Sequence, residues 1–227
     1  DLLPYLVVVG IIAILLLLET HLSATIIMIS IAAIMLFVAG ARIKHFLILA
    51  APVIAGLSAV IMFTDYMTPR INAYLDPWSN PLGEGWQTIQ SLYAIGSGGL
   101  FGRGLGQSMQ KFGYIPYAHN DYIFSILAEE LGFIGGGIII LLFMLLLWRI
   151  LSVAGSARDM YGALIATGAA AMIGFHVVEN IGMTLGVMPV TGIPLPFISY
   201  GGSSLITNML AVGLVLNVGM RRQKINF

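Results

Sequence analysis

The apolar run "YIFSILAEELGFIGGGIIILLFMLLLW", residues 122–148, decides the fold class of this chain. It is longer than the roughly 20 residues that a helix needs to cross a bilayer. In the whole chain, 59% of the 227 residues are hydrophobic and only 9% are charged. Soluble domains carry about 25% charged residues, so the composition predicts an integral membrane protein.

Five other apolar runs are long enough to cross a membrane. With the first, they lie near residues 2–18, 22–40, 46–64, 122–148, 161–188 and 203–220. The sequence shows no alternating β-barrel pattern, so helices must satisfy the backbone hydrogen bonds within the bilayer. We therefore predict an all-α integral membrane protein with about six transmembrane helices.

The runs arrange the chain as one membrane domain in three parts. Residues 1–64 hold three predicted spans, residues 65–121 form a long structured loop, and residues 122–227 hold three further spans. A second loop at 186–204, "GVMPVTGIPLPFISYGGSS", contains too much proline and glycine for a continuous helix. We expect a re-entrant-like loop lining a polar cavity; the alternative is a plain connecting loop.

The basic residues predict the orientation in the membrane. Seven fall on one side of a six-span arrangement: Arg42, Lys44, Arg149, Arg158, Arg221, Arg222 and Lys224. The positive-inside rule makes that side cytoplasmic, together with the C-terminus. Both long loops are then on the outer face, and the three remaining basic residues all lie in the first of them.

Composition also excludes several classes of function. The chain has no cysteine, which removes disulfides, thiolate metal sites and a cysteine nucleophile. Its net charge is zero, so there is no electrostatic case for binding nucleic acid. No HExxH motif is present, and we predict no metal site. The chain begins with Asp1 and shows no signal peptide, as expected for a piece of a longer protein.

Three external cations, Arg70, Arg103 and Lys111, favour an anionic ligand such as a phosphate. The alternative is ordinary ion pairing with acids of the same loop, namely Asp65, Asp76 and Glu84. Between these cations, "GWQTIQSLYAI" predicts a short amphipathic helix that can lie at the membrane surface. We expect Trp86, Ile89 and Tyr93 on one face of this helix and Gln87, Gln90 and Ala94 on another.

The segment "YIPYAHNDYIF", residues 114–124, places His119, Asn120 and Asp121 at the start of the longest apolar run. Asp121 fits a general base at the membrane boundary, while Asn120 or Asp121 equally fits a helix N-cap.

Further carboxyls lie within the predicted spans. Glu129 and Glu130 sit in the fourth span, where a carboxyl normally faces a cavity or a partner. His176 and Glu179 share a helix face, which favours a structural polar pair.

Several long motifs resemble the SEDS family, typified by FtsW, RodA and SpoVE. They are "QSLYAIGSGGLFGRGLGQSMQK" at 90–111, "IPYAHNDYIFSILAEELGFIG" at 115–135 and "NIGMTLGVMPVTGIPLPFISYGGSS" at 180–204. The likeness covers essentially the whole chain and leaves the branch of the family open. Family members have about ten spans, so the chain resembles their C-terminal portion. Tyr117 departs from the family, which often has glutamate there.

The resemblance implies a peptidoglycan glycosyltransferase that polymerises lipid II at the outer face of the bacterial plasma membrane. The family's essential aspartate corresponds to Asp121, which would be the catalytic base. We expect the lipid-linked substrate to be contacted by Arg70, Gln87, Gln90, Arg103, Lys111, His119, Glu129 and Ser199. The resemblance requires no cofactor and leaves a divalent cation, Mg or Mn, open.

The implied partners are lipid II and the undecaprenyl-pyrophosphate-linked glycan, a class B penicillin-binding protein, and the division or elongation machinery. Two other functions remain open at this point. A lipid II flippase fits the interrupted second loop and the carboxyls within the spans. A non-catalytic scaffold for a penicillin-binding protein requires none of the chemistry assigned to Asp121.

Overall fold

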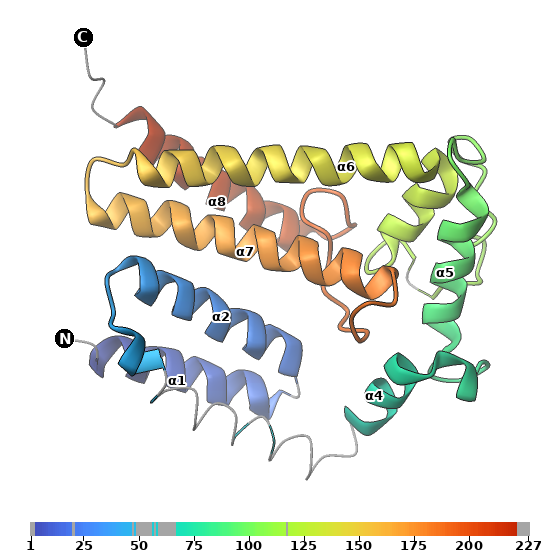
Figure 1. Cartoon of the computed structure of the whole chain (residues 1–227), viewed down its shortest axis with the longest axis horizontal. Helices are drawn as coiled ribbons and strands as arrows, with labels where there is room; N and C mark the ends of the chain where they lie inside the picture. The colour runs from blue at the N-terminus through green and yellow to red at the C-terminus, as the bar shows by residue number, and fades with distance from the viewer. Residues whose placement is uncertain are drawn as a thin grey trace. The chain divides into compact units, whose positions relative to one another are not determined.

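The structure is a computed structural model that describes residues 3–19, 21–46, 48, 56, 58, 67–116 and 118–221. Every regular element in these residues is a helix (Figure 1), which confirms the predicted all-α fold. The elements are α1 (Leu3–Leu18), α2 (Leu22–Val38), α4 (Met67–Leu75), η1 (Pro77–Ser79), α5 (Trp86–Gly98), α6 (Ile123–Gly155), α7 (Met160–Thr184) and α8 (Gly202–Met220).

Three helices, α6, α7 and α8, are long and apolar enough to cross a membrane. Helices α1 and α2 are also apolar but have only 16 and 17 residues. The third predicted span, 46–64, falls almost entirely outside the described residues, as do Asp65, Tyr117, Arg222 and Lys224. The count of six spans therefore stays a prediction.

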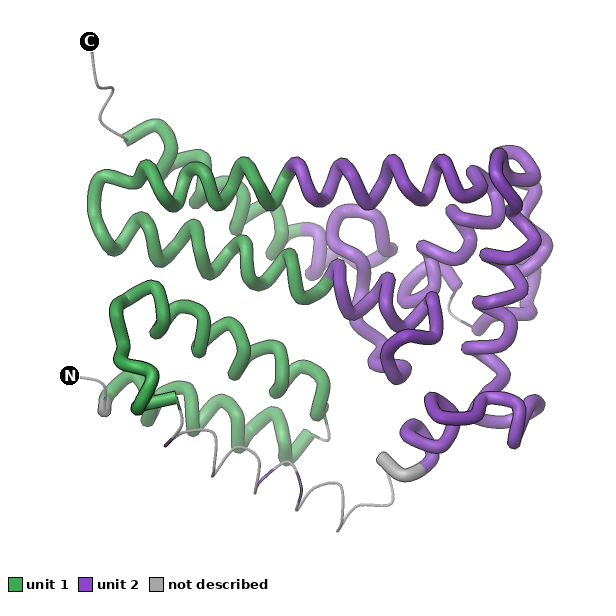
Figure 2. The backbone as a smooth tube through the Cα atoms, in the orientation of Figure 1, with its two compact units in different colours: residues 1–47, 146–176, 206–227 green, residues 48–145, 177–205 purple. Residues whose placement is uncertain are grey.

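The chain divides into two compact units (Figure 2). One comprises residues 1–47, 146–176 and 206–227, and the other comprises residues 48–145 and 177–205. The boundary passes through α6, α7 and α8. Both predicted long loops, 65–121 with Asp121 as its last residue and 186–204, belong to the second unit.

In the first unit, helices approach one another at small residues. A Cβ atom on Gly168 of α7 would lie 3.1 Å from the Met35 sulfur of α2. The Tyr5 hydroxyl of α1 donates a hydrogen bond to the Ala32 carbonyl of α2, at 3.0 Å. Small residues at such crossings let backbones come close where lipid gives no hydrophobic drive for association.

In the second unit, α6 is broken at Gly132, whose backbone (φ 70°, ψ −170°) is not helical. The part after this break, residues 133–155, is about 35 Å long at about 1.5 Å per residue. That length matches a hydrocarbon core of about 30 Å with a modest tilt. The break therefore explains why the apolar run is longer than one span requires.

The break in α6 is filled by the glycine loop, which we define as residues 98–106. Backbone N–H groups of residues 103 and 104 donate to the carbonyls of residues 129 and 130, each at 3.0 Å. The N–H groups of residues 133 and 134 donate to the carbonyls of residues 99 and 100, at 2.8 and 3.2 Å. In an unbroken helix these four α6 groups would bond to each other, so the loop replaces one turn of helical bonding.

The predicted helix at 85–95 is present as α5, but its predicted faces are wrong in part. Gln90 and Ala94 are buried alongside Ile89, whereas Tyr93 is 52% exposed. The reason is tertiary: Ala94 belongs to a buried cluster with Tyr122 and Met183, among others. Packing against these neighbours, rather than the polarity of the sequence, selects the buried face.

Candidate active site

Asp121 lies two residues before α6 begins, in a half-buried position. Burial raises the pKa of its carboxyl above the ordinary value, and the nearby His119 lowers that pKa in part. Neither Asp121 nor Asn120 caps α6, because neither side chain makes a hydrogen bond to the described residues. The N-cap alternative is therefore wrong, and the carboxylate is left available to another group.

The second loop is fastened to the backbone around Asp121. The Ser199 hydroxyl donates to the Asn120 carbonyl at 2.5 Å, and the Tyr200 N–H donates to the His119 carbonyl at 3.0 Å. The His119 and Tyr200 rings also meet edge to face, 5.6 Å between centroids. The loop is thus tightly folded over this corner.

Asn180, near the end of α7, ties the same corner together. Its fully buried amide donates to the Asp121 carbonyl at 2.8 Å and to the Ile193 carbonyl at 2.7 Å. Gly192, next to Ile193, has φ +73°, and a Cβ added there would lie 3.6 Å from the Asp121 carboxylate oxygen Oδ2. A bare backbone therefore faces the carboxylate.

Of the three predicted external cations, only Arg70 of α4 belongs to this corner. Its guanidinium donates to the Val190 carbonyl at 3.4 Å and acts electrostatically on Tyr122. Tyr122 is itself buried, and the Asp121 carboxylate also acts electrostatically on its phenol. One cation and one carboxylate therefore lie around the start of α6.

The other two cations pair with carboxylates of α6. Arg103 Nη1 lies 3.4 Å from Glu129 Oε1, and Lys111 Nζ lies 2.8 Å from Glu130 Oε1. Ion pairing, the alternative to an anionic ligand, is thus present for these two cations. The predicted partners are wrong, because the carboxylates come from α6 and not from the loop.

Glu129 is only 1% exposed and accepts hydrogen bonds from Ser97, Ser108, and the N–H groups of Met109 and Gln110. Such a carboxylate has no free face for substrate, so its contacts do not support a binding role.

A groove of about 480 Å³ opens beside these ion pairs. It is lined by Leu92, Tyr93, Gly96, Ser97, Arg103, Met109, Gln110, Tyr114 and Glu129. The predicted substrate-binding residues Arg103 and Glu129 line this groove. No described contact joins either of them to Asp121. Gln87 is half-buried and Gln90 is buried in α5, and no described contact joins either one to Asp121.

The predicted pair of His176 and Glu179 is wrong. His176 Nδ1 lies 2.6 Å from the Met172 carbonyl one turn earlier, and Glu179 interacts with Thr191 of the second loop. His176 thus finds its partner within α7, whereas Glu179 finds its partner in the second loop. Within the described residues, no group of three or more His, Asp or Glu side chains is arranged to hold a metal.

The family model described as "Cell cycle protein", for FtsW, RodA and SpoVE, matches residues 1–224. The chain belongs to this family. It is 54% identical over 192 residues to stage V sporulation protein E of Bacillus subtilis, covering 85% of this chain and 52% of the relative. It is 41% identical over 218 residues to a probable peptidoglycan glycosyltransferase FtsW of a Geobacter species, covering 96% and 59%.

Solved structures of the family share the fold. A peptidoglycan synthase complex that coordinates polymerization and crosslinking contains a chain with TM-score 0.73 and 37% identity, covering 98% of this chain and 61% of that one. RodA, the rod shape determining protein of Thermus thermophilus, matches with TM-score 0.62 and 34% identity, covering 98% and 56%. This FtsW/RodA/SpoVE chain thus spans between about half and three-fifths of the length of these relatives.

Sequence reasoning missed Asn180 and Gly192 in this family member. Asn180 carried a usable signal, since an amide inside an apolar span must find hydrogen-bond partners. Gly192 carried none, because one glycine among four in the loop does not reveal which of them faces a carboxylate. Ser199 was predicted to contact substrate, but in the structure its hydroxyl holds the loop to Asn120.

Replacing Asn180 with alanine should destabilise the corner and reduce the activity that depends on it. The change leaves two buried carbonyls without their donor, and each such loss costs about 1–3 kcal/mol. We expect a lower melting temperature and faster proteolysis of the second loop. Asn72→Ala, at an exposed amide of α4, is the control; equal melting temperatures for the two variants would contradict the clamp.

Proposed function

We propose that the protein is an inverting glycosyltransferase that polymerises lipid II into glycan strands. The observation that carries the proposal is the Asp121 carboxylate, which is half-buried, bonded to no described residue and covered by a clamped loop. Membership of a family with members named peptidoglycan glycosyltransferase supports this choice of chemistry.

The reaction joins the anomeric carbon of a lipid-pyrophosphate-linked sugar to a hydroxyl of the acceptor sugar. The α-linked donor becomes a β-linked product, so one displacement suffices and no covalent enzyme intermediate is required. Asp121 takes the proton of the attacking hydroxyl as the C–O bond to the pyrophosphate breaks. Arg70 supplies positive charge for the leaving pyrophosphate.

The proposed setting is the bacterial plasma membrane, with Asp121 at the outer face and the C-terminus in the cytoplasm. The apolar helices support a membrane location, and the distribution of basic residues supports this orientation. The proposed partner is a class B penicillin-binding protein, since the matching synthase complex combines polymerization with crosslinking. Attachment to the division or elongation machinery is part of the same proposal.

The deciding experiment supplies purified full-length protein and its partner with lipid II in proteoliposomes. Glycan polymer in the products supports the transferase. Leaflet exchange of lipid II without polymer would instead support a flippase, for which the Glu179 carboxyl inside α7 is the favourable feature. A scaffold would be indicated if the protein gave neither glycan polymer nor leaflet exchange but still activated the penicillin-binding protein.

The rate of polymerisation should fall on the acid side at a higher pH than an ordinary aspartate would give. Burial raises the pKa of Asp121, so protonation removes the base before an exposed carboxyl would be protonated. His119→Gln should move this acid limb to still higher pH, because His119 lowers that pKa. The measurement is a pH–rate profile with His21→Gln as control; an unmoved limb would contradict the assignment.

A further inference from the structure

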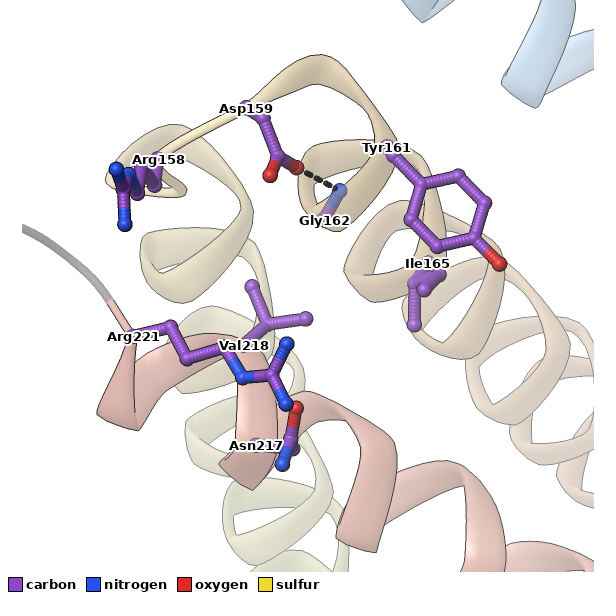
Figure 3. Close-up of a pocket in the computed structure, with 8 residues that line it drawn as sticks. All are labelled: Arg158, Asp159, Tyr161, Gly162, Ile165, Asn217, Val218 and Arg221. Atoms are coloured by element: carbon purple, nitrogen blue, oxygen red, sulfur yellow. Dashed lines mark hydrogen bonds between the residues drawn. The ribbon is translucent and has the colours of Figure 1, made fainter.

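The first compact unit contains a second polar site that the proposed reaction does not use. A hollow of about 100 Å³ lies where α7 begins and α8 ends (Figure 3). Its polar lining comes from Arg158, Asp159, Asn217 and Arg221. A single water needs only about 10–15 Å³ of such volume, so there is room for a polyatomic anion.

Two arginines from different helices give this hollow its charge. Arg158 precedes α7 and Arg221 follows α8, and both are exposed. Neither side chain makes a hydrogen bond or ion pair to any residue in the described part of the chain. Figure 3 shows the Arg221 guanidinium beside the Asn217 side chain, with the amide oxygen of Asn217 toward the guanidinium and its amide nitrogen farther away.

The one acid of the hollow is already engaged. Asp159 Oδ1 accepts the Gly162 N–H at 2.7 Å and so caps the first turn of α7. Its charge faces the positive end of that helix and is partly compensated by it. With two arginines against one capped aspartate, the lining carries a net formal charge of +1, which favours an anion.

Apolar neighbours favour an anion at a lipid boundary. Ile165 and Val218 form part of the wall, and the exposed Tyr161 ring also lines it. The ends of α7 and α8 are where the apolar spans stop, on the side that the positive-inside rule makes cytoplasmic. Basic pockets between membrane helices on this side bind phosphate-bearing lipid headgroups.

We propose that this hollow binds a phosphate group through Arg158 and Arg221, with Asn217 as a neutral donor. The planar guanidinium groups match phosphate oxygens in pairs, which a lysine does not. The phosphate belongs either to an anionic phospholipid of the inner leaflet or to a free cytoplasmic anion. The hollow and the Asp121 site share no residue, so this proposal does not depend on the proposed catalysis.

The test uses the full-length protein in nanodiscs of phosphatidylcholine alone or mixed with phosphatidylglycerol. Inorganic phosphate is titrated separately into the phosphatidylcholine nanodiscs. Melting temperature and lipid retained in native mass spectrometry are the readouts, because a ligand that binds only the folded state raises stability. A response to phosphatidylglycerol alone identifies a headgroup, and a response to phosphate identifies a free-anion site.

The double variant Arg158→Gln/Arg221→Gln should weaken binding by about tenfold or more, since each lost contact is a hydrogen bond to a charged group. The double variant with lysine at both positions should lose part of this affinity. Arg42→Gln/Arg149→Gln is the matched control, because both arginines are exposed and lie on the same predicted side. The proposal is overturned if both glutamine pairs behave alike, or if the wild type responds to neither probe.

Discussion

Asp121→Asn should reduce lipid II polymerisation by at least about a hundredfold in the reconstituted full-length protein with its partner, since general-base catalysis typically contributes about 10²–10⁴. Asparagine keeps the size and half-buried position of the side chain but has no basic oxygen. The backbone carbonyl of residue 121, which accepts from Asn180, is unaffected. The measurement is the length and yield of glycan formed at saturating lipid II.

Stability distinguishes lost chemistry from lost folding in this variant. The pKa of Asp121 is raised in the folded protein, so the folded state holds the proton more strongly than the unfolded state does. Stability from this group is therefore present at low pH and is lost as pH rises through the folded pKa. Removing the charge should leave the melting temperature at neutral pH unchanged or higher. Normal polymer from Asp121→Asn would show that this carboxyl is not the base.

Gly132→Ala should strongly destabilise the second unit. A Cβ at this position would lie 2.3 Å from the Gly102 backbone nitrogen and 2.6 Å from the Leu100 carbonyl. These atoms belong to backbone that cannot rotate away, and the positive φ of 70° adds strain for alanine. We expect a loss of about 4 kcal/mol or more, seen as a large fall in melting temperature or in folded yield.

Gly137→Ala is the matched control for this prediction. Gly137 lies in the same helix, and a Cβ there would meet nothing within 4 Å. Alanine is favoured over glycine in a helix by about 1 kcal/mol, so this variant should be neutral or slightly stabilised. Equal melting temperatures for the two alanine variants would mean that the glycine loop does not occupy the break in α6.

The hydropathy of the sequence predicted most of the helices but not where the longest one breaks. In "GFIGGG", four glycines occur within six residues, and only Gly132 adopts positive φ. What distinguishes it is the close approach of Gly102, which is 30 residues earlier in the chain. Such a contact has no local signature, so the position of the break could not be read from the sequence.

The candidate site was predicted in its centre and not in its surroundings. Asp121 could be chosen because a carboxylate at the start of an apolar run is costly unless it has a partner or a function. The cations could not be placed, because separation along the chain does not predict contact. Arg103 and Lys111 are closer in sequence to Asp121 than Arg70 is, yet Arg70 is the cation at the Asp121 corner. Their partners, Glu129 and Glu130, are set by how the glycine loop meets α6.

The exchange of backbone bonds between the glycine loop and α6 has a consequence for motion. Lifting the loop would strip partners from two α6 carbonyls and two α6 N–H groups at once, and unpaired backbone groups are costly at an apolar boundary. Loop and helix must then open as one cooperative unit. The irregular glycine loop should therefore open as slowly as the membrane span to which it is bonded, and the Arg103 and Gly104 amides should share the hydrogen-exchange protection of that span.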